Sequence, residues 1–413
     1  MKVAVMLKSL MNNTDGIARH AIQLSHELMV MGHQVTVWVV EYNKINCSEL
    51  VKNLDIRSLR CTQKLTFPPS RIARLGIVEW LELILSAYKD QKDLSRAMPD
   101  GYDVINPHGH LIIWAAVDYK RKYGVPVVWV CNDFWPPAYH NPKAASTRLQ
   151  ELKLSIKQLI SLPIKTYDLA AVSEVDEIAV LSKFIKAQIT GYYQVSPIVV
   201  RPGVNGDRFV DGDGGWVKSR YSILNMSFLL LTVCSLMPRR RLEDVIQAIE
   251  ILVSHGYNIT YLIVGRTTHH LEYTRFIRAE VAARNLESRV LMIGEVSEEE
   301  LIGCYQACDA FIWPADENQS WGMAGTEAMS SGKPIIVSRA NGLAEILEDK
   351  VTGFLIPPRS PNLIAKSIKQ LISDPALTQS VGKAGQQLIR EHYSWRKNAQ
   401  NMIDLFQGAI DKR

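Results

Sequence analysis

The stretch Trp313–Pro334, WPADENQSWGMAGTEAMSSGKP, decides how the rest of the chain is interpreted. It follows a short apolar run, Asp309–Trp313, that is typical of a buried strand, and it continues into a helical pattern around Glu327. Gly322 and Gly325 lie three residues apart before that helix, so the backbone there can approach a ligand closely. The free amides of the first helical turn and the positive end of the helix dipole favour an anion at this place. A diphosphate fits such a site.

The carboxylate of Glu327 lies one turn into the expected helix. An ionised carboxylate only accepts hydrogen bonds, so its natural partners are hydroxyl groups, such as the pair on a ribose, and not phosphate oxygens. The stretch therefore predicts a site for a nucleoside diphosphate. The alternative is a glycine-rich turn that only caps a buried helix.

The length of 413 residues favours two domains of about 200 residues each. The apolar content of 47% and the charged content of 22% are ordinary for a soluble globular protein. No run of about 18 apolar residues is present, and the first residues are strand-like and too short for a signal peptide, so we expect a cytoplasmic protein. The six cysteines show no metal-ligand spacing and are expected to be reduced core thiols.

The net charge of +5 is confined to the first half of the chain. Residues 1–195 contain 23 Lys and Arg against 18 Asp and Glu, whereas residues 196–413 contain 24 of each class. A basic first domain favours an anionic acceptor or an anionic membrane surface, although an ordinary solvated surface explains five charges equally well. The amphipathic helix expected at 146–162 leaves the same choice open between membrane contact and a solvated face.

The first 40 residues read as strand, loop, helix and strand, which is a βαβ unit whose ligand end is the loop after the first strand. That loop contains no Gly-x-Gly-x-x-Gly, which argues against a dinucleotide cofactor. Two later apolar runs, Asp103–His108 and Val125–Cys131, end in polar residues. This pattern is typical of central parallel strands that carry functional groups at their carboxyl ends.

The second half repeats the alternation, with strands expected at 228–236, 259–265 and 289–294 and helices at 242–253 and 271–284. Arg239, Arg240 and Arg241 stand at the start of a helix, where the helix dipole makes cations unfavourable. We therefore expect an anion in front of them, because Arg makes bidentate contacts to phosphate. Asp211 and Asp213 have a spacing that can hold a divalent metal, but their DGDGG context is that of a turn.

These motifs resemble those of the retaining glycosyltransferases of family 4, also described as glycosyl transferases group 1, which have the GT-B fold. In that family a Glu, seven residues and a second Glu frame the glycine-containing loop, and an Ala-Met-x-x-Gly-x-Pro helix end follows. Glu327 matches the second Glu, and Gln319 stands at the position of the first. Arg240 matches a Lys of the family, whereas Ser235 stands at the position of the family's Arg.

His108, in the sequence NPHGH, matches a His that the family places at a strand end, facing the transferred sugar. His110 is the alternative for that role. The next strand end carries Asn132–Trp135, which we expect at another edge of the same cleft. Further segments that match the family lie at 175–189, 199–209, 341–345, 351–358 and 393–395, so the resemblance covers nearly the whole chain.

The resemblance implies an α/β protein of two Rossmann-like domains, each a doubly wound parallel sheet, facing each other across a cleft. We expect an acceptor-binding domain at 1–197, a nucleotide-sugar donor-binding domain at 198–394 and a C-terminal helix at 395–413 that crosses back to the first domain. The expected reaction is transfer of a hexose from a nucleoside diphosphate sugar to an acceptor hydroxyl with retention of anomeric configuration. No cofactor and no metal is expected to be obligatory.

The expected partners are the nucleotide sugar and a small-molecule, glycan or lipid-linked acceptor in glycan biosynthesis, and not a nucleic acid. The expected location is the cytoplasm, with a peripheral contact at the inner membrane face left open. The residues at Gln319 and Ser235 leave a catalytically impaired nucleotide-binding scaffold as one alternative. A nucleotide-sugar epimerase is the other.

The resemblance also implies roles for individual residues. The expected catalytic residues are His108, Gln319, Arg240 and Glu327, of which His108 and Gln319 meet the donor sugar and Glu327 meets the ribose. The donor-binding residues are expected in the first-domain loop, the arginine cluster, the strand ends that hold the base and the glycine loop: Gly16, Arg239, Arg240, Gly265, Arg266, Val296, Gln319, Ser320, Trp321, Gly322, Met323, Ala324, Gly325 and Glu327.

Overall fold

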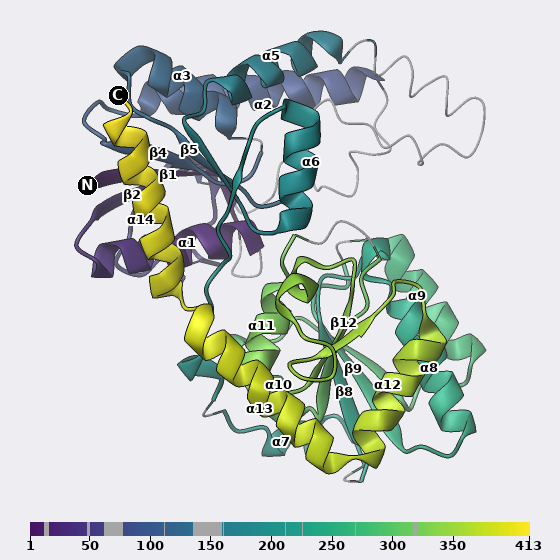
Figure 1. Ribbon diagram of the computed structural model, residues 1–413. Helices are drawn as coiled ribbons and strands as arrows, with labels where there is room; N and C mark the ends of the chain where they lie inside the picture. Colours follow the sequence, from purple (N-terminus) through teal and green to yellow (C-terminus); the bar gives the residue numbers. More distant parts are fainter. Residues whose placement is uncertain are drawn as a thin grey trace. The chain divides into compact units, whose positions relative to one another are not determined.

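The chain divides into two compact units. Unit 1 consists of Met1–Val200 and Asn398–Arg413, and unit 2 consists of Arg201–Lys397. The domain boundaries predicted from the sequence lie after residues 197 and 394. The computed structural model describes residues 1–11, 16–47, 50–61, 77–110, 112–134, 159, 161–210, 212–224, 226–268, 270–316 and 320–413 (Figure 1).

Unit 1 alternates strands and helices along the chain. Its elements are β1 (Lys2–Leu10), α1 (Gly16–Val30), β2 (Gln34–Tyr42), β3 (Asp55–Cys61), α2 (Ile77–Ala97), β4 (Val104–Pro107), α3 (Ile113–Tyr123), β5 (Val128–Cys131), α5 (Leu162–Ser173), β6 (Glu177–Val180), α6 (Lys183–Tyr193) and β7 (Ile198–Val199). Most of the last helix, α14 (Trp395–Asp411), also belongs to this unit. The amphipathic helix expected at 146–162 lies mainly outside the described residues.

All the described strand pairs of unit 1 are parallel, in the orders β3-β2-β1-β4 and β5-β6-β7. Isolated parallel bridges, Ile105 with Val127 and His108 with Val130, join β4 to β5. The strands therefore follow one another as β3-β2-β1-β4-β5-β6-β7. The order reverses between β1 and β4, and in parallel sheets ligands bind beyond the carboxyl ends of the strands at such a reversal.

Unit 2 begins with short elements and continues as a second doubly wound sheet. Its elements are η3 (Asp207–Phe209), α7 (Gly215–Arg220), β8 (Phe228–Val233), η4 (Pro238–Arg240), α8 (Leu242–Ser254), β9 (Ile259–Val264), α9 (Leu271–Ala283), β10 (Val290–Gly294), α10 (Glu298–Ala307), β11 (Ala310–Trp313), α11 (Met323–Ser330), β12 (Ile335–Ser338), η5 (Gly342–Ile346), β13 (Phe354–Ile356), α12 (Pro361–Ser373) and α13 (Pro375–His392). The strand order is β10-β9-β8-β11-β12-β13, and every described pair is parallel.

The local sequence explains these elements. The strand β9, ITYLIV, is buried along its whole length, as expected for a central strand of a sheet that is covered on both faces. The helix α10 begins with a capping box, in which Ser297 and Glu300 each bond the backbone N–H of the other. Figure 1 shows α8, α9 and α12 on one side of the unit 2 sheet, with α10 and α11 on the other.

The prediction of two Rossmann-like parallel-sheet domains is confirmed by these two strand orders. The prediction that the cysteines are core thiols holds for five of them, whereas Cys61 at the end of β3 is exposed. No helix within the described parts of the chain is both long and apolar enough to span a bilayer.

Candidate active site

The strand order of unit 2 reverses between β8 and β11, so the loops that follow these two strands meet at the carboxyl edge of the sheet. The backbone N–H of Asp316, after β11, donates to the carbonyl of Arg239, after β8, at 3.3 Å. The guanidinium carbon of Arg240 lies 4.8 Å from the ring centroid of Trp313, within the range of a cation–π contact. The two loops therefore carry Arg239 and Arg240 to the place where a parallel sheet binds ligands.

The thiol of Cys234, which follows β8, lies close enough to Arg239 and Arg240 for their charges to affect its pKa. Burial raises the pKa of the Cys234 thiol to about 11, and the positive charges of Arg240 and Arg239 act in the opposite direction. The field of the two guanidiniums thus reaches the carboxyl end of the central strand, where a polyphosphate would benefit from it.

Arg241 does not join Arg239 and Arg240 in this site. The prediction that an anion lies in front of all three arginines is wrong for Arg241. Its guanidinium contacts Asp244 at 2.6 Å and Glu243 at 2.7 Å, and both carboxylates lie in the first turn of α8. Arg241 is therefore compatible with the start of its helix because the acidic residues there neutralise it. Its own backbone, with φ of 53°, lies in the left-handed region.

The glycine loop leads directly into α11. Gly322 is the N-cap residue with φ of 102°, and no side chain caps the helix. The N–H of Gly325 donates to the carbonyl of Gly322 at 3.0 Å, so the N–H groups that precede it are the ones that lie before the hydrogen-bonded turns of the helix. A Cβ on Gly325 would lie 2.4 Å from Cδ2 of Leu343, a side chain of η5. A side chain at position 325 would therefore clash with Leu343. At position 322 glycine is favoured for a different reason, because the backbone there has a positive φ. Met323 and Ala324 lie between them in the first turn.

Three buried hydrogen-bond donors surround this loop and have no partner within the described residues. They are the hydroxyl of Ser320, the indole N–H of Trp321 and the amide nitrogen of Asn341. Asn341 lies close to the glycine loop, because a Cβ on Gly322 would be 3.3 Å from Nδ2 of Asn341. Buried donors without partners are rare, and here they are gathered beside an uncapped helix start. This arrangement suits the acceptor oxygens of an anion or a sugar.

Glu327 lies in α11 with 3% of its surface exposed, and its Oε2 accepts a hydrogen bond of 2.8 Å from the hydroxyl of Tyr305 in α10. The ring of Tyr305 also contacts the rings of Phe209 and Phe311. The carboxylate therefore has a fixed orientation. Gln319, the residue at the family's first Glu position, lies outside the described residues.

The residues expected to hold a base lie at the ends of β9 and β10. A Cβ on Gly265, whose φ is 134°, would lie 2.1 Å from the carbonyl oxygen of Cys234, so only glycine fits between these strand ends. Arg266 forms an ion pair of 3.1 Å with Glu295, and Val296 is half-buried. The sequence predicted the place of these residues but not the reason for Gly265, which is the close approach to β8.

In unit 1 the corresponding reversal lies between β1 and β4, and His108 follows β4 there. Gly16 is the first residue of α1, and residues 12–15 of the preceding loop lie outside the described residues. His108 is buried, and its ring lies edge to face with that of His20 of α1, with centroids 5.3 Å apart. Nδ1 of His20 lies 3.0 Å from the amide nitrogen of Asn132, which follows β5. Three elements thus meet at the carboxyl edge of the unit 1 sheet.

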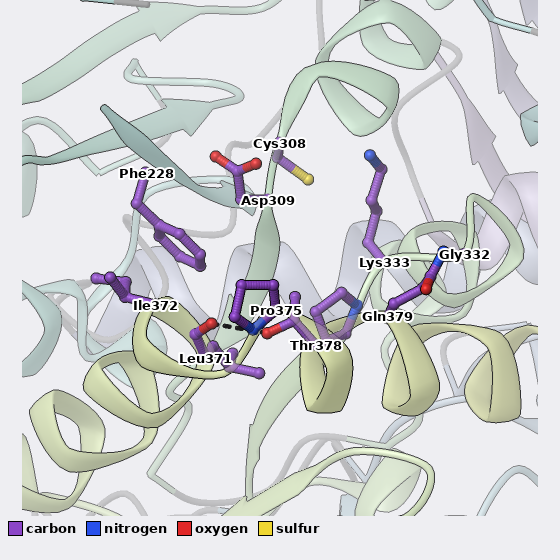
Figure 2. A pocket seen from close by; sticks show the side chains of 11 residues that line it. Phe228, Cys308, Asp309, Gly332, Lys333, Leu371, Ile372, Pro375, Thr378 and Gln379 are labelled. Carbon is purple, nitrogen blue, oxygen red and sulfur yellow. Dashed lines mark hydrogen bonds between the residues drawn. The ribbon is translucent and has the colours of Figure 1, made fainter. Parts of the chain in front are cut away.

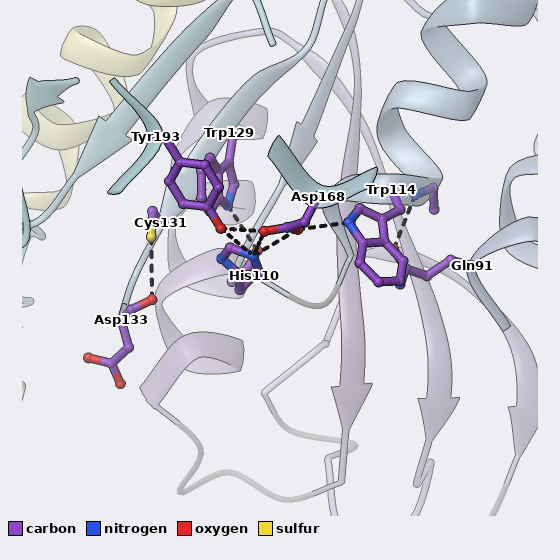
Figure 3. A network of polar contacts seen from close by, with 10 residues as sticks. Gln91, His110, Trp114, Trp129, Cys131, Asp133, Asp168 and Tyr193 are labelled. Carbon is purple, nitrogen blue, oxygen red and sulfur yellow. Dashed lines mark hydrogen bonds and ion pairs between the residues drawn. The ribbon is translucent and has the colours of Figure 1, made fainter. Parts of the chain in front are cut away.

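His110 lies in a different environment from His108. Its Nε2 is 3.1 Å from Oδ1 of Asp168 in α5, and Trp114 and Tyr193 also donate to that carboxylate (Figure 3). Burial raises the pKa of Asp168, but the electrostatic interaction with His110 and the hydrogen bonds from His110, Tyr193 and Trp114 outweigh it, so the pKa is lowered overall. The network joins α3, α5 and α6 inside the unit 1 core, and it therefore has a structural role.

The described His, Cys, Asp and Glu side chains form no metal site. Within the described residues no group of three His, Cys, Asp or Glu side chains could hold a metal ion. Asp213 accepts a hydrogen bond of 2.8 Å from the N–H of Gly215, as expected for a turn, and Asp211 lies outside the described residues.

A cavity of about 520 Å³ lies at the opposite edge of the unit 2 sheet (Figure 2). Phe228, Asp309 and Pro334, which line it, stand at the amino ends of β8, β11 and β12. The carboxylate of Asp309 already accepts from the N–H of Leu229 at 2.7 Å. The cavity is therefore remote from the carboxyl edge that carries the arginines and the glycine loop, and it is not the candidate site.

Two doubly wound units, with a candidate anion site at the carboxyl edge of the second, define the GT-B class of glycosyltransferases. The model of "Glycosyltransferase Family 4" matches residues 14–208, and that of "Glycosyl transferases group 1" matches residues 218–388. The chain belongs to this family, and it is a glycosyltransferase.

The similar proteins are distant. A D-inositol 3-phosphate glycosyltransferase of Saccharomonospora viridis is 22% identical over 323 residues, which are 76% of this chain and 71% of that protein. An uncharacterized glycosyltransferase of Methanocaldococcus jannaschii is 22% identical over 405 residues, covering 96% and 95% of the two chains. The crystal structure of Anabaena HepE in complex with UDP and glucose covers 98% of this chain and 99% of its own with a TM-score of 0.71 at 16% identity. This structural likeness shows the fold.

Proposed function

We propose that the enzyme transfers a hexose from a nucleoside diphosphate sugar to an acceptor hydroxyl with retention of anomeric configuration. The proposal rests on one observation: Arg239 and Arg240 contact the loop after β11. The helix that follows this loop, α11, begins without a side-chain cap. Both features favour a polyphosphate. The binding of UDP and glucose by a protein of the same fold supports a nucleotide-sugar donor.

In the proposed reaction the bond between the anomeric carbon and the diphosphate oxygen breaks, and the acceptor oxygen bonds to that carbon from the same face. The departing diphosphate takes the proton of the acceptor hydroxyl. Stabilising the charge that develops on the diphosphate is then the main catalytic task, which the guanidiniums of Arg239 and Arg240 and the amides of Gly322–Gly325 perform electrostatically. No metal or cofactor is assigned to this step.

The remaining roles follow from the donor and acceptor properties of the side chains. The carboxylate of Glu327, oriented by Tyr305, accepts hydrogen bonds from the ribose hydroxyls. Gly265, Arg266 and Val296 hold the base. Ser320, Trp321 and Gln319 bind the diphosphate and the donor sugar, His108 contacts that sugar, and Gly16 meets a phosphate. The acceptor binds mainly to unit 1.

A screen of UDP, GDP and ADP sugars for thermal stabilisation tests the proposal, because a ligand at about 100 times its dissociation constant adds about 2.7 kcal/mol to stability. One base should stabilise the protein more than the other two. The product made from the best donor should then show, by the proton coupling at its anomeric carbon, the configuration of the donor. An inverted product would contradict retention, and binding without transfer or donor hydrolysis would favour a nucleotide-binding scaffold.

A further inference from the structure

Two polar side chains of unit 1 lie two residues apart near the end of β4, on the same face of the strand. Asn106 is completely buried, and His108 has 2% of its surface exposed. The amide nitrogen of Asn106 lies 2.7 Å from the carbonyl oxygen of Val128 in β5. A carbonyl only accepts, so the NH₂ group must face it, and this contact fixes the orientation of the amide. Oδ1 of Asn106 therefore faces the imidazole.

The orientation of that amide decides where the proton of His108 lies. Nε2 of His108 is 2.8 Å from Oδ1 of Asn106, and an amide oxygen only accepts, so Nε2 carries the hydrogen. Burial holds the pKa of His108 well below its ordinary value, and the neighbouring His20 acts in the same direction. The ring is therefore neutral, and Nδ1 bears a lone pair and no hydrogen.

The lone pair of Nδ1 meets no donor among the described residues. This atom is buried and makes no hydrogen bond within the described part of the chain, which leaves out residues 12–15 and 111 among others. His110 provides the contrast, because its Nε2 faces the carboxylate of Asp168, whereas His108 faces a neutral amide. A carboxylate at position 106 would favour a charged ring with two donors. The side chain at 106 therefore determines what His108 can bind.

We propose that Asn106 is a positioning residue that fixes His108 in the Nε2–H form, so that Nδ1 accepts a hydrogen bond from a hydroxyl of the transferred sugar. Phosphate and carboxylate oxygens are excluded at this atom because they only accept at neutral pH. The identity of the ligand as a sugar rests on the proposed function, whereas the protonation form of the ring does not. The inference adds a residue, Asn106, that no sequence motif indicates.

The first test reads the ring directly and needs no substrate. The protein is labelled with ¹⁵N-histidine, and the two ring nitrogens of His108 are assigned by comparison with His108→Asn. We expect the neutral Nε2–H form, with no titration of the ring between about pH 6 and pH 8. Asn106→Ala should lose the preference for that form, because Nε2 then lacks its acceptor.

Gln91→Ala is the matched control, since Gln91 is also buried in unit 1 and its side-chain oxygen accepts from the N–H of Ala115. It should leave the signals of His108 unchanged. The proposal would be overturned if the wild-type ring carried its proton on Nδ1 or were charged between about pH 6 and pH 8. It would also be overturned if a folded Asn106→Ala protein kept the preference for the Nε2–H form.

The second test identifies the functional nitrogen by two substitutions of similar size. Oδ1 of an asparagine at 108 would stand where Nδ1 of the histidine stands, whereas a glutamine places its polar atoms near the position of Nε2. His108→Asn should therefore retain a kcat at least about tenfold above that of His108→Gln, with equal affinity for the free nucleoside diphosphate. A glutamine variant as active as the asparagine variant would contradict the role of Nδ1. If wild type transfers no sugar at all, the proposed function fails while the protonation result stands.

Discussion

The hydroxyl of Tyr305 donates a hydrogen bond of 2.8 Å to Oε2 of Glu327, and so a residue of α10 orients the buried carboxylate of α11. The two residues are 22 positions apart in the sequence. In our account this contact holds Glu327 in the orientation in which it accepts from the ribose. Tyr305 is therefore a positioning residue for the nucleotide, although it is completely buried.

Tyr305→Phe should weaken the binding of the preferred nucleoside diphosphate by about threefold to tenfold, because one hydrogen bond to a charged group is lost. Calorimetric titration measures this effect. Tyr261→Phe is the matched control, since Tyr261 is also buried in unit 2 and its hydroxyl donates to Thr232. The control should lower the melting temperature without changing the nucleotide affinity. Equal affinities for the two variants would show that Tyr305 contributes only to stability.

The neighbouring arginines should respond differently to substitution. Arg241→Ala should lower the free energy of unfolding by about 1–3 kcal/mol, because Asp244 and Glu243 lose their partner at the start of α8, and it should leave nucleotide affinity unchanged. Arg240→Ala should lower the free energy of unfolding less than Arg241→Ala does, and it should weaken diphosphate binding, because the guanidinium of Arg240 lies against Trp313 at the ligand-binding edge of the sheet. Urea denaturation and calorimetry together measure both properties. The reverse assignment of the two effects would refute the distinction.

The two histidines of NPHGH should likewise separate into a functional and a structural residue. His108→Ala should lower kcat by about 100-fold or more while the affinity for the free nucleoside diphosphate stays within about twofold of wild type. His110→Ala should instead lower the melting temperature, because it removes one of the hydrogen-bond partners of the buried carboxylate of Asp168. Single-turnover transfer at the wild-type rate by a folded His108→Ala protein would exclude a role for His108.

These contrasts also show what the sequence could predict. The strand and helix pattern, the glycine loop and Glu327 were predictable because the signals are local: hydrophobic runs, glycines at fixed spacing and a carboxylate one turn into a helix. The prediction for Arg241 was wrong because it considered only the helix dipole. It left out the carboxylates of Glu243 and Asp244, which follow Arg241 in the sequence and neutralise its charge. The carboxylates two and three residues after Arg241 were visible in the sequence and would have corrected that assignment.

Other contacts could not have been predicted from local signals. Tyr305 and Glu327, or Asp168 and His110, meet because the fold brings together helices and strand ends that are 22 and 58 residues apart. Nothing in the surroundings of Asn106 in the sequence distinguishes it from an ordinary strand residue. Its significance depends on the carbonyl of Val128, which only the pairing of β4 with β5 places beside it.

The acid stability of unit 1 should depend on Asp168. Its pKa in the folded protein is lowered below the ordinary value of 3.8, so its stabilising effect is complete above about pH 4 and is lost as the pH falls through the folded pKa. Asp168→Asn should lower the free energy of unfolding at pH 7 by about 3 kcal/mol and should flatten the fall in stability below about pH 4. Urea melts at several pH values measure both effects.

The control for this experiment is Asp118→Asn, which removes a more exposed carboxylate that pairs with Arg121 in α3. It should change stability by less than about 0.5 kcal/mol. A stability profile of Asp168→Asn that runs parallel to that of wild type below pH 4 would contradict the network as the cause.

The central claim is that a nucleoside diphosphate binds at the carboxyl edge of the unit 2 sheet. Calorimetric titration of UDP, GDP and ADP into wild type, Arg240→Ala and Glu327→Ala tests it most directly. We predict that one of the three binds to wild type, and that each substitution weakens it by at least about tenfold while the protein stays folded. Binding of equal strength to all three proteins, or no binding to wild type, would contradict the account.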